Sequence, residues 1–324
     1  MNNLVDSSQR NINYLRISVT DRCNLRCIYC MPETGIKWIA HSEILTYEEI
    51  ATVVRVGADL GINKIRITGG EPLTRAELPK LIKMLSETNG VDEISLTTNG
   101  ILLKKQVLEL KDAGLRRINI SLDTFKQERF KQITRLGNLQ DVLDGIDAAK
   151  NAGLNPVKID MVVIKGINDD EIIDFARKTY EQGWHIRFIE LMPLSNIKGI
   201  ISVKEMRSRI ESLDKLETAS APVGNGPARY YRLPGAKGTI GFISPVTEPF
   251  CRWCNRLRLT SYGQLCSCLL SDGGVDLRKP LRNINLPEEE IRRLFLELVA
   301  SKPAHHDLAN NNLALSHKMS QIGG

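Results

Sequence analysis

The feature that most constrains the fold of this chain is a regular alternation of short β-branched runs with amphipathic helical patterns. The runs predict strands over Leu15–Val19, Lys64–Thr68, Glu93–Thr97, Arg117–Leu122, Val157–Ile164 and Ile186–Leu191. Several helical patterns end in a glycine followed by an apolar residue and then a strand, at Gly61-Ile62, Gly114-Leu115, Gly153-Leu154 and Gly183-Trp184. Glycine adopts the left-handed conformation that ends a helix, so this repetition predicts successive βα units.

The segments between the strands have the apolar stripe of surface helices. Thr46–Leu60 is the clearest case, because Thr46 and Glu49 have the spacing of a capping box, and Ala76–Ser86 carries a similar stripe. Strands joined by crossover helices form a parallel sheet, which is either doubly wound or curled into a partial barrel. In both architectures ligands bind in the loops at the C-terminal ends of the strands.

The pattern changes near residue 220. Ala221–Pro234 is rich in Pro and Gly and predicts a loop, and beyond it a helix is expected over Pro287–Ala300 among short β-like pieces. We therefore expect a first domain over residues 1–220 and a C-terminal region over residues 221–324. The C-terminal region is too irregular to fold alone without a metal centre.

The composition indicates a globular protein of the cytoplasm. The chain has 324 residues, 42% hydrophobic and 25% charged, so it can bury a core without disulfides. It has no run of about 20 apolar residues and no signal-like apolar start, so no membrane association is expected. In the cytoplasm its seven cysteines stay reduced, and closely spaced ones are metal ligands or catalytic groups. The net charge of +6 suits an anionic ligand.

A C-x3-C-x2-C motif, formed by Cys23, Cys27 and Cys30, follows the first expected strand directly. Three thiolates at this spacing can hold three irons of a [4Fe–4S] cube and leave the fourth iron open to an outside ligand. The alternatives are a zinc site that lacks one ligand, or three incidental thiols. Structural zinc takes four ligands, and incidental cysteines rarely crowd together after a strand, so the motif favours the cluster.

The second expected strand ends in the turn Thr68-Gly69-Gly70-Glu71-Pro72. Its glycines allow a ligand to approach the backbone closely, and Glu71 offers an acceptor for an ammonium group. Together with the three-cysteine motif, this turn resembles the radical S-adenosylmethionine superfamily. The resemblance implies a partial (β/α)6 barrel of the TIM type, with an open iron that binds the amino and carboxylate groups of S-adenosylmethionine.

A second group of cysteines lies in the C-terminal region, at Cys251, Cys254, Cys266 and Cys268. The spacing alone favours a four-cysteine zinc ribbon. The competing interpretation is a second iron–sulfur cluster held by Cys251, Cys254 and Cys268, again with an open iron.

The residues around the second group reverse that preference. Cys251–Thr260 has the pattern Cys-x2-Cys-Asn-Arg-x-Arg-x-Thr, and the chain ends in Gly323-Gly324. These features resemble the GTP 3′,8-cyclase family of molybdenum cofactor biosynthesis. The resemblance covers nearly the whole chain and includes Leu15–Cys23, Ile65–Pro72, Leu96–Gly100, Arg117–Asp123 and Arg187–Met192.

The resemblance implies an enzyme, a lyase, with two [4Fe–4S] clusters and S-adenosylmethionine as cofactors. In the family the first cluster reduces S-adenosylmethionine, and the resulting 5′-deoxyadenosyl radical removes the hydrogen at C3′ of GTP. C3′ then bonds to C8 of guanine, which gives (8S)-3′,8-cyclo-7,8-dihydroguanosine 5′-triphosphate in the first step of the pathway. The fold that follows is an α/β partial barrel with a C-terminal extension that carries the second cluster.

The resemblance also assigns roles to matched residues. It places the first cluster on Cys23, Cys27 and Cys30, and the second on Cys251, Cys254 and Cys268. It assigns S-adenosylmethionine contacts to Tyr29, Gly70, Ser121 and Met192, and GTP contacts to Arg16, Arg66, Thr97, Lys158, Arg256, Leu257 and Arg258. It gives catalytic roles to Arg256, Arg258, Gly323 and Gly324, the two glycines being part of a mobile tail that reaches into the active site. Cys266 departs from the family pattern.

The implied partners are a reducing electron donor such as flavodoxin or ferredoxin, a second copy of the chain in a homodimer, and the cyclic pyranopterin monophosphate synthase, which takes the product. Two rivals stay open: a peptide-modifying radical enzyme with an auxiliary cluster, and a zinc-ribbon module that binds nucleic acid. The second has little support, because aromatic residues are only 5% of the chain and do not alternate with basic ones. The phosphate-loop and Rossmann glycine motifs are absent from the sequence.

Overall fold

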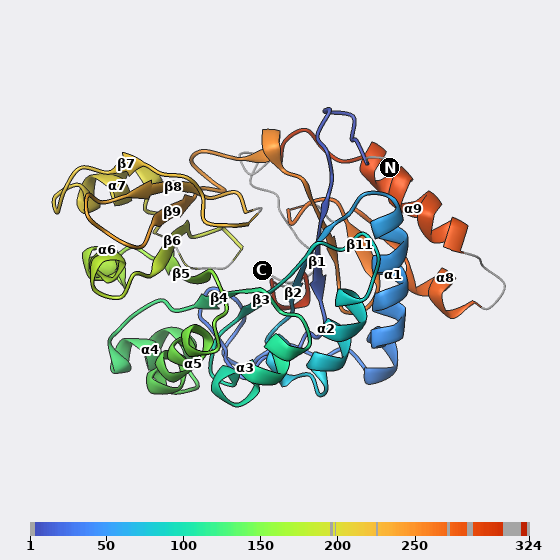
Figure 1. Cartoon of the computed structure of the whole chain (residues 1–324), viewed down its shortest axis with the longest axis horizontal. Helices are drawn as coiled ribbons and strands as arrows, with labels where there is room; N and C mark the ends of the chain where they lie inside the picture. The colour runs from blue at the N-terminus through green and yellow to red at the C-terminus, as the bar shows by residue number, and fades with distance from the viewer. Residues whose placement is uncertain are drawn as a thin grey trace.

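The centre of the fold is a sheet of parallel strands (Figure 1). The computed structural model describes residues 4–194, 197, 199–224, 226–270, 273–283, 288–306 and 319–322. The first strands are β1 (Tyr14–Ser18), β2 (Lys64–Thr68), β3 (Glu93–Thr98), β4 (Arg117–Ser121), β5 (Val157–Val163) and β6 (His185–Glu190). They pair in chain order, each parallel to the next. The partial α/β barrel expected from the sequence is confirmed, and each expected strand lies within one residue of the observed one.

Helices connect the strands and cover the outer face of the sheet (Figure 1). They are α1 (Tyr47–Asp59), α2 (Leu78–Ser86), α3 (Leu103–Asp112), α4 (Gln127–Thr134), α5 (Leu139–Asn151), α6 (Ile172–Glu181) and α7 (Val203–Ile210). The expected capping box is present, because the Thr46 hydroxyl accepts from the Glu49 amide and the Glu49 carboxylate accepts from the Thr46 amide. The helix-ending glycines have left-handed backbone, with φ of 101° at Gly61 and 114° at Gly114.

The C-terminal region extends both edges of the same sheet. Its elements are β7 (Glu217–Thr218), β8 (Arg229–Arg232), β9 (Ile240–Ile243), β10 (Arg256–Leu259), β11 (Gln264–Cys266), β12 (Gly274–Asp276), α8 (Arg278–Arg282), α9 (Glu288–Ala300) and α10 (Met319–Ile322). β9 pairs in parallel with β6, and β10 pairs in parallel with β1. The domain boundary near residue 220 stays a prediction, since the strands on both of its sides share one sheet.

The loop expected over Ala221–Pro234 is wrong in its second half. Arg229–Arg232 forms β8, which pairs antiparallel with β9. Tyr230 on this strand is buried, with 6% of its surface exposed. Pairing with the next strand and burial of an aromatic ring therefore outweigh the Pro and Gly residues on either side.

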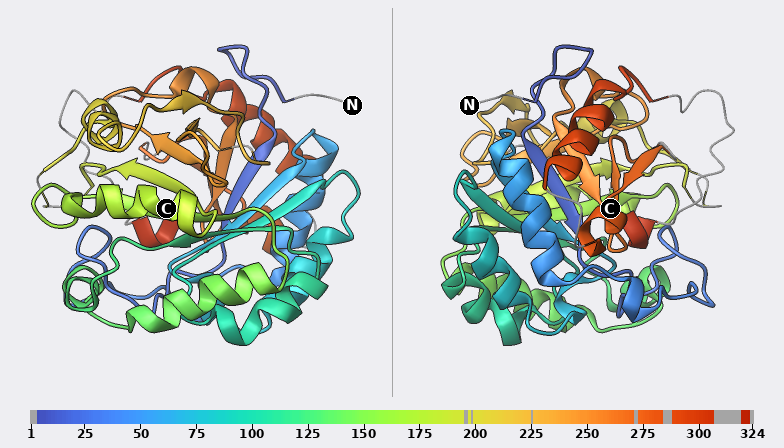
Figure 2. Two further views of the ribbon diagram at one scale, coloured as in Figure 1. Left: turned by 60° about the vertical axis from the view of Figure 1, so that its left-hand side comes forward. Right: turned by 90° about the vertical axis from the view of Figure 1, so that its right-hand side faces the viewer.

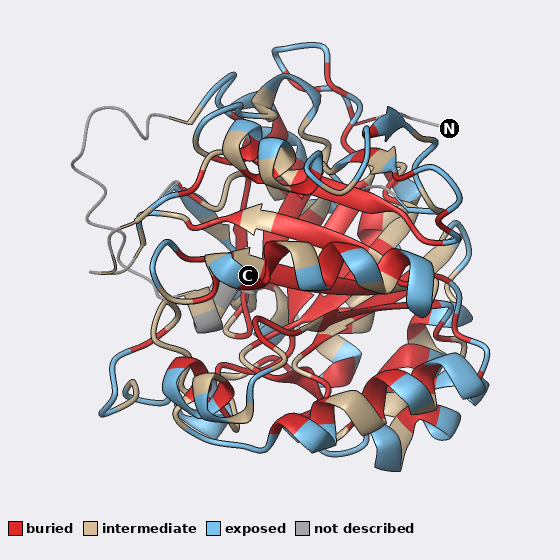
Figure 3. Ribbon diagram, turned by 90° about the vertical axis from the view of Figure 1, so that its left-hand side faces the viewer, coloured by how far each residue is buried: buried red, intermediate tan, exposed pale blue. Residues whose placement is uncertain are grey.

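Side chains on the strands alternate between two different environments. On β1, Leu15 and Ile17 are fully buried in the apolar core under the helices, while Tyr14 and Arg16 line a cavity on the inner face. The same alternation separates Leu257 from Arg256 on β10. Figure 3 shows the central strands mostly buried, with the helices exposed on their outward sides. The inner face is therefore polar and is available for a ligand.

The C-terminal helix α9 closes the outer face beside the first helix. It packs against α1, where Phe295 lies close to Gly57, and Figure 2 shows the two helices next to each other. No helix in the described ranges is long and apolar enough to cross a membrane.

The turn after β2 lies directly against the loop after β1. The Gly70 amide donates to the carbonyl of Thr20 over 2.7 Å. A Cβ on Gly70 would come within 2.3 Å of the Arg22 carbonyl oxygen and 2.8 Å of the Asp21 carbonyl oxygen. The two glycines of the turn are therefore needed for close packing of one backbone against another, at the start of the three-cysteine loop.

Gly70→Ala should destabilise the protein by about 3 kcal/mol, because the new methyl group overlaps backbone that cannot rotate away. The measurement is the free energy of unfolding in urea, followed by circular dichroism. Gly235→Ala is the matched control, because an added Cβ there meets no atom within 4 Å although φ is 79°. We expect the control to cost about 1 kcal/mol. Equal losses in the two variants would contradict the proposed overlap.

Candidate active site

The inner face of the barrel encloses a cavity of about 300 Å³. Its walls come from the C-terminal ends of the parallel strands and from β10. Most of the residues predicted from the sequence meet there: Cys23, Cys27, Tyr29, Cys30, Gly70, Ser121 and Met192 on one side, and Arg16, Arg66, Thr97, Arg256 and Arg258 among the strands. One cavity thus joins the three-cysteine loop to a group of arginines.

The three-cysteine loop is held by the C-terminal end of α4. The Arg26 amide donates to the Thr134 carbonyl over 3.0 Å, and the Ile28 amide donates to the Ile133 carbonyl over 2.9 Å. The Arg135 guanidinium returns to the loop and donates to the Arg26 carbonyl over 2.9 Å. These contacts fix the backbone on which the cysteines sit.

The cysteines of this loop are half-buried, and their thiols are close enough to affect one another. Burial raises the pKa of Cys23 to about 12, and burial followed by the charge of Cys30 raises the pKa of Cys27 as well. The Leu25 amide donates to the Cys23 sulfur over 3.4 Å. A bound cation ionises such thiols, so they suit a positively charged group. Among the described residues no group of side chains is arranged to hold a single metal ion, whereas in an iron–sulfur cube each thiolate binds a different iron.

Tyr29, the residue before Cys30, is fixed by Asp123, which lies just after β4. The Tyr29 hydroxyl donates to Asp123 over 2.6 Å, and the Val162 amide donates to the other oxygen of that carboxylate over 2.8 Å. Burial raises the pKa of Asp123 to about 6. Asp123 was not singled out from the sequence.

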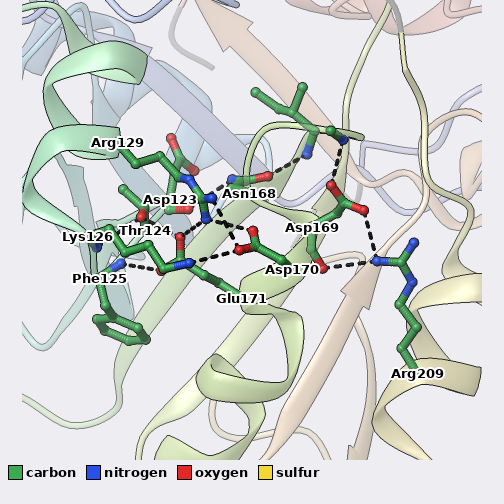
Figure 4. A network of polar contacts seen from close by, with 12 residues as sticks. Asp123, Thr124, Phe125, Lys126, Arg129, Asn168, Asp169, Asp170, Glu171 and Arg209 are labelled. Atoms are coloured by element: carbon green, nitrogen blue, oxygen red, sulfur yellow. Dashed lines mark hydrogen bonds and ion pairs between the residues drawn. The ribbon is translucent and has the colours of Figure 1, made fainter.

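A second layer of polar contacts holds the segment around Asp123 (Figure 4). The Asn168 side chain donates to the Asp123 carbonyl and to the Val162 carbonyl, each over 2.9 Å. The buried Glu171 carboxylate accepts from the Thr124 hydroxyl over 2.6 Å and from the Phe125 amide over 2.7 Å. The loops after β4 and β5 are therefore tied together behind the cavity.

Glu71 lines the cavity, but its carboxylate also binds the protein. Its oxygens accept from the Leu73 amide over 2.9 Å, the Thr98 hydroxyl over 2.7 Å and the Asn99 amide over 2.7 Å. Burial raises the pKa of Glu71 to about 7, although these donors oppose the change. Glu71, which the sequence analysis expected to accept from a ligand ammonium, thus links the end of β2 to the end of β3 through these hydrogen bonds.

Three arginines lie side by side on neighbouring strands and form a row across the sheet. In the register of the sheet, Arg16 on β1 lies opposite Arg258 on β10 and opposite Arg66 on β2. Arg66 and Arg258 are 3% and 8% exposed. Burial, and then the charge of Arg256, lowers the pKa of Arg258 to about 10. Like charges side by side in a sheet are unfavourable, so this row suits a polyanion.

Tyr14 lies under this row and was not singled out from the sequence. The Nε of Arg66 donates to the Tyr14 hydroxyl, and the other end of Arg66 donates to the Thr97 hydroxyl over 3.2 Å. Burial raises the pKa of Tyr14, but the charges of Arg66 and Arg16 outweigh it and bring the value to about 8. The phenol thus orients Arg66.

Three further cavity residues were missed by the sequence analysis as individual site residues. Arg187 on β6 makes a two-bond contact with the Asp160 carboxylate on β5, one bond measuring 2.5 Å. Asn119 on β4 donates to Asp160 over 3.5 Å. Polar residues at alternate positions of apolar strands are the signal that could have found them.

Lys158 and Leu257 stand apart from the cavity wall. The Lys158 ammonium donates to the carbonyls of Pro222 and Val223 over 3.3 and 3.1 Å. Burial, followed by the charges of Arg187 and Arg117, lowers the pKa of Lys158 to about 6. The Leu257 side chain is fully buried in the apolar core, so only its backbone can reach a ligand.

The second cysteine group borders the arginine side of the cavity. An Arg256 nitrogen lies 3.7 Å from the Cys254 sulfur. Burial raises the pKa of Cys254, but Arg256 and Lys302 outweigh it and bring the value to about 7. Burial and the charges of Cys268 and Cys254 raise the pKa of Cys251, which places these three thiols near one another. Cys266 is buried on β11, opposite Arg258 in the register.

The short helix α10 near the end of the chain packs against β1, and its Met319 lines the cavity. Gly323 and Gly324 lie outside the described residues.

Two family models together match most of the chain. The model of the radical SAM superfamily matches residues 17–179. The model described as Molybdenum Cofactor Synthesis C matches residues 184–308. Radical SAM membership implies a [4Fe–4S] cluster and S-adenosylmethionine, which the three-cysteine loop and the neighbouring cavity fit.

Solved structures share the fold at low sequence identity. Streptococcus suis SuiB bound to S-adenosylmethionine has a TM-score of 0.60 and 14% identity, over 87% of this chain and 68% of that one. SuiB bound to its precursor peptide SuiA has a TM-score of 0.61 and 15% identity, over 87% and 66%.

Curated relatives are similar along their full length. A GTP 3′,8-cyclase of Moorella thermoacetica is 50% identical over 98% of this chain and 99% of its own. One from Thermodesulfovibrio yellowstonii is also 50% identical, over 98% and 99%. One from Pelotomaculum thermopropionicum is 48% identical over the same shares. With such similarity along its whole length, the chain belongs to the GTP 3′,8-cyclase family of the radical SAM superfamily.

Proposed function

We propose that this protein is a GTP 3′,8-cyclase that converts GTP into (8S)-3′,8-cyclo-7,8-dihydroguanosine 5′-triphosphate. The observation that carries the proposal is a single cavity with a three-cysteine loop at one side and a row of arginines at another. The full-length similarity to proteins of that name supports the choice of substrate. When bound, the first cluster and S-adenosylmethionine supply the 5′-deoxyadenosyl radical that removes the hydrogen from C3′ of GTP.

Cys23, Cys27 and Cys30 hold the first cluster in this proposal, and Tyr29, Gly70, Ser121 and Met192 contact S-adenosylmethionine. The support is the placement of all seven residues along one side of the cavity. The hydrogen bond from Tyr29 to Asp123 fixes the loop relative to β4.

GTP binds across the arginine row. Arg16, Arg66 and Arg258 face the triphosphate, since guanidinium groups match phosphate oxygens and a polyanion relieves their mutual repulsion. Tyr14 and Thr97 hold Arg66 in position. The remaining wall includes apolar side chains, namely Val162, Ile189, Leu191 and Ile243, which exclude water and stray hydrogen donors from the reacting carbons.

Cys251, Cys254 and Cys268 would hold the second cluster, which would supply an open iron for binding the guanine of GTP. The support is the contact between Arg256 and Cys254, since Arg256 also lines the cavity. The proposal also gives Gly323 and Gly324 a catalytic role, and it is supported by the preceding helix, whose Met319 lines the cavity.

The proposal includes partners that rest on the family resemblance alone. A flavodoxin or ferredoxin delivers electrons, two copies of the chain form a homodimer, and the product passes to the cyclic pyranopterin monophosphate synthase in the cytoplasm.

Reduced protein incubated without oxygen with GTP and S-adenosylmethionine should form 5′-deoxyadenosine and an isomer of GTP in equal amounts. Mass spectrometry of the quenched mixture measures both products. Arg258→Met should lower product formation at least about tenfold, because it removes one charge-assisted contact to the triphosphate. The control is ATP in place of GTP. Formation of 5′-deoxyadenosine without any GTP-derived product would agree with radical cleavage of S-adenosylmethionine but would contradict GTP as the substrate.

Burial and the charges of Arg187, Arg117 and Arg66 lower the pKa of Lys158 to about 6. A triphosphate bound at Arg66 offsets the charge of that arginine and raises the pKa of Lys158, so GTP binding above pH 6 should take up a proton there. At pH 8 the free lysine is mostly neutral, so we expect uptake of about one proton per GTP and weaker binding as the pH rises. Calorimetry in two buffers of different ionisation enthalpy measures the uptake. Lys158→Gln should abolish it, and the same uptake in this variant would rule out Lys158 as the site.

A further inference from the structure

A lysine that the sequence analysis did not consider lies buried beside the second cysteine group. Lys302 follows α9 directly and is only 3% exposed. Its ammonium donates to the Arg256 carbonyl over 3.0 Å and to the Ser267 carbonyl. Lysine is almost never buried without a specific partner. Here the partners are backbone oxygens of the two segments that carry Cys254 and Cys268.

A buried arginine from the other end of the chain completes the arrangement. Arg10 is 6% exposed and donates to the Cys251 carbonyl over 2.7 Å. It also donates to the Pro303 carbonyl over 2.8 Å, next to Lys302, and the Asp6 carboxylate accepts from it over 2.5 Å. The N-terminal segment accordingly runs close to α9 (Figure 1).

Together the two cations fasten every segment that supplies a cysteine to the second group. Arg10 binds the backbone carbonyl of Cys251. Lys302 binds one carbonyl in the segment after Cys254 and one in the segment before Cys268, and so bridges the two segments. Pro303 joins the two cations to each other. The three thiols come from two stretches that the antiparallel pair β10–β11 brings side by side. The ties through Arg10 and Lys302 then fix the backbone next to each thiol.

The charges differ in how they are compensated. Arg10 has a carboxylate partner in Asp6, which offsets its charge locally. Lys302 instead donates to the neutral carbonyl oxygens of Arg256 and Ser267. Its positive charge therefore lies between the segments that carry Cys254 and Cys268.

We propose that Lys302 and Arg10 are positioning residues of the second iron–sulfur cluster, and that Lys302 also favours its reduced form. This inference rests on the second-cluster part of the proposed function. A cube held by three thiolates gains one negative charge when an external reductant donates one electron. A cation buried beside it at low dielectric stabilises that added charge and raises the reduction potential.

The test uses the second cluster alone, in a background in which Cys23, Cys27 and Cys30 are changed to serine. Lys302→Met removes the charge, Lys302→Arg keeps it, and Lys279→Met removes an exposed lysine charge as the control. Redox titration with paramagnetic resonance measures the ratio of reduced to oxidised cluster at a fixed potential. We expect a fall of about tenfold or more in Lys302→Met and little change in the other two.

Several outcomes decide the inference. The same ratio in Lys302→Met and Lys279→Met would overturn the charge effect. If Lys302→Met loses its iron in that background, the substitution is repeated in the protein that keeps Cys23, Cys27 and Cys30, so that iron can be measured at both cysteine groups. Loss confined to the second group, with iron kept in Lys302→Arg, supports the positioning role, whereas equal loss from both groups with loss of helical signal overturns it. Arg10→Gln should speed iron release to a chelator from the second group only, and release at the unaltered rate would remove Arg10 from the proposal.

The proposed function fails in a different way. If the unaltered protein held zinc or no iron at the second group, the second cluster itself would be wrong, before any lysine variant was compared.

Discussion

The interaction on which the site depends is the repulsion among arginines that the parallel register holds at one level of the barrel. Arg258, Arg16 and Arg66 occupy adjacent strands, and burial deprives Arg66 and Arg258 of the water that would screen their charges. Burial raises the pKa of the neighbouring Tyr14, but the charges of Arg66 and Arg16 outweigh this effect and lower it. A fold that keeps such a row is stable without a ligand only because the sheet and its apolar outer face are extensive, and a polyanion is the ligand that the row fits best.

The second constraint is that strand pairing places residues next to each other that are far apart in the sequence. β10 pairs with β1, so the arginines of the C-terminal region lie next to the strand that leads into the three-cysteine loop. The glycine turn after β2 then packs onto the start of that loop. The first cysteine group thus lines the same cavity as Arg256, which contacts Cys254 of the second group, although more than half the chain separates the two groups. Arg10 and Lys302 make a similar link between the two ends of the chain.

Local signals in the sequence predicted the local parts of this structure. Strand limits, the capping box at Thr46 and the left-handed glycines follow from neighbouring residues, and the motifs identified the cysteines and most cavity residues. The pairing of β9 with β6 was not predictable in this way, since it joins segments about 50 residues apart, and β8 in turn forms by pairing with β9. Asp123, Asp160 and Lys302 were missed for the same reason: their importance comes from burial and from partners that only the fold brings near.

The central claim is that the cavity holds C3′ of GTP against the radical derived from S-adenosylmethionine. GTP that carries deuterium at C3′ tests this directly, because the label reports which hydrogen is removed. The account predicts that mass spectrometry finds the deuterium in 5′-deoxyadenosine and that the cyclised product has lost it. Turnover that yields 5′-deoxyadenosine without deuterium, from fully labelled GTP, would contradict the account.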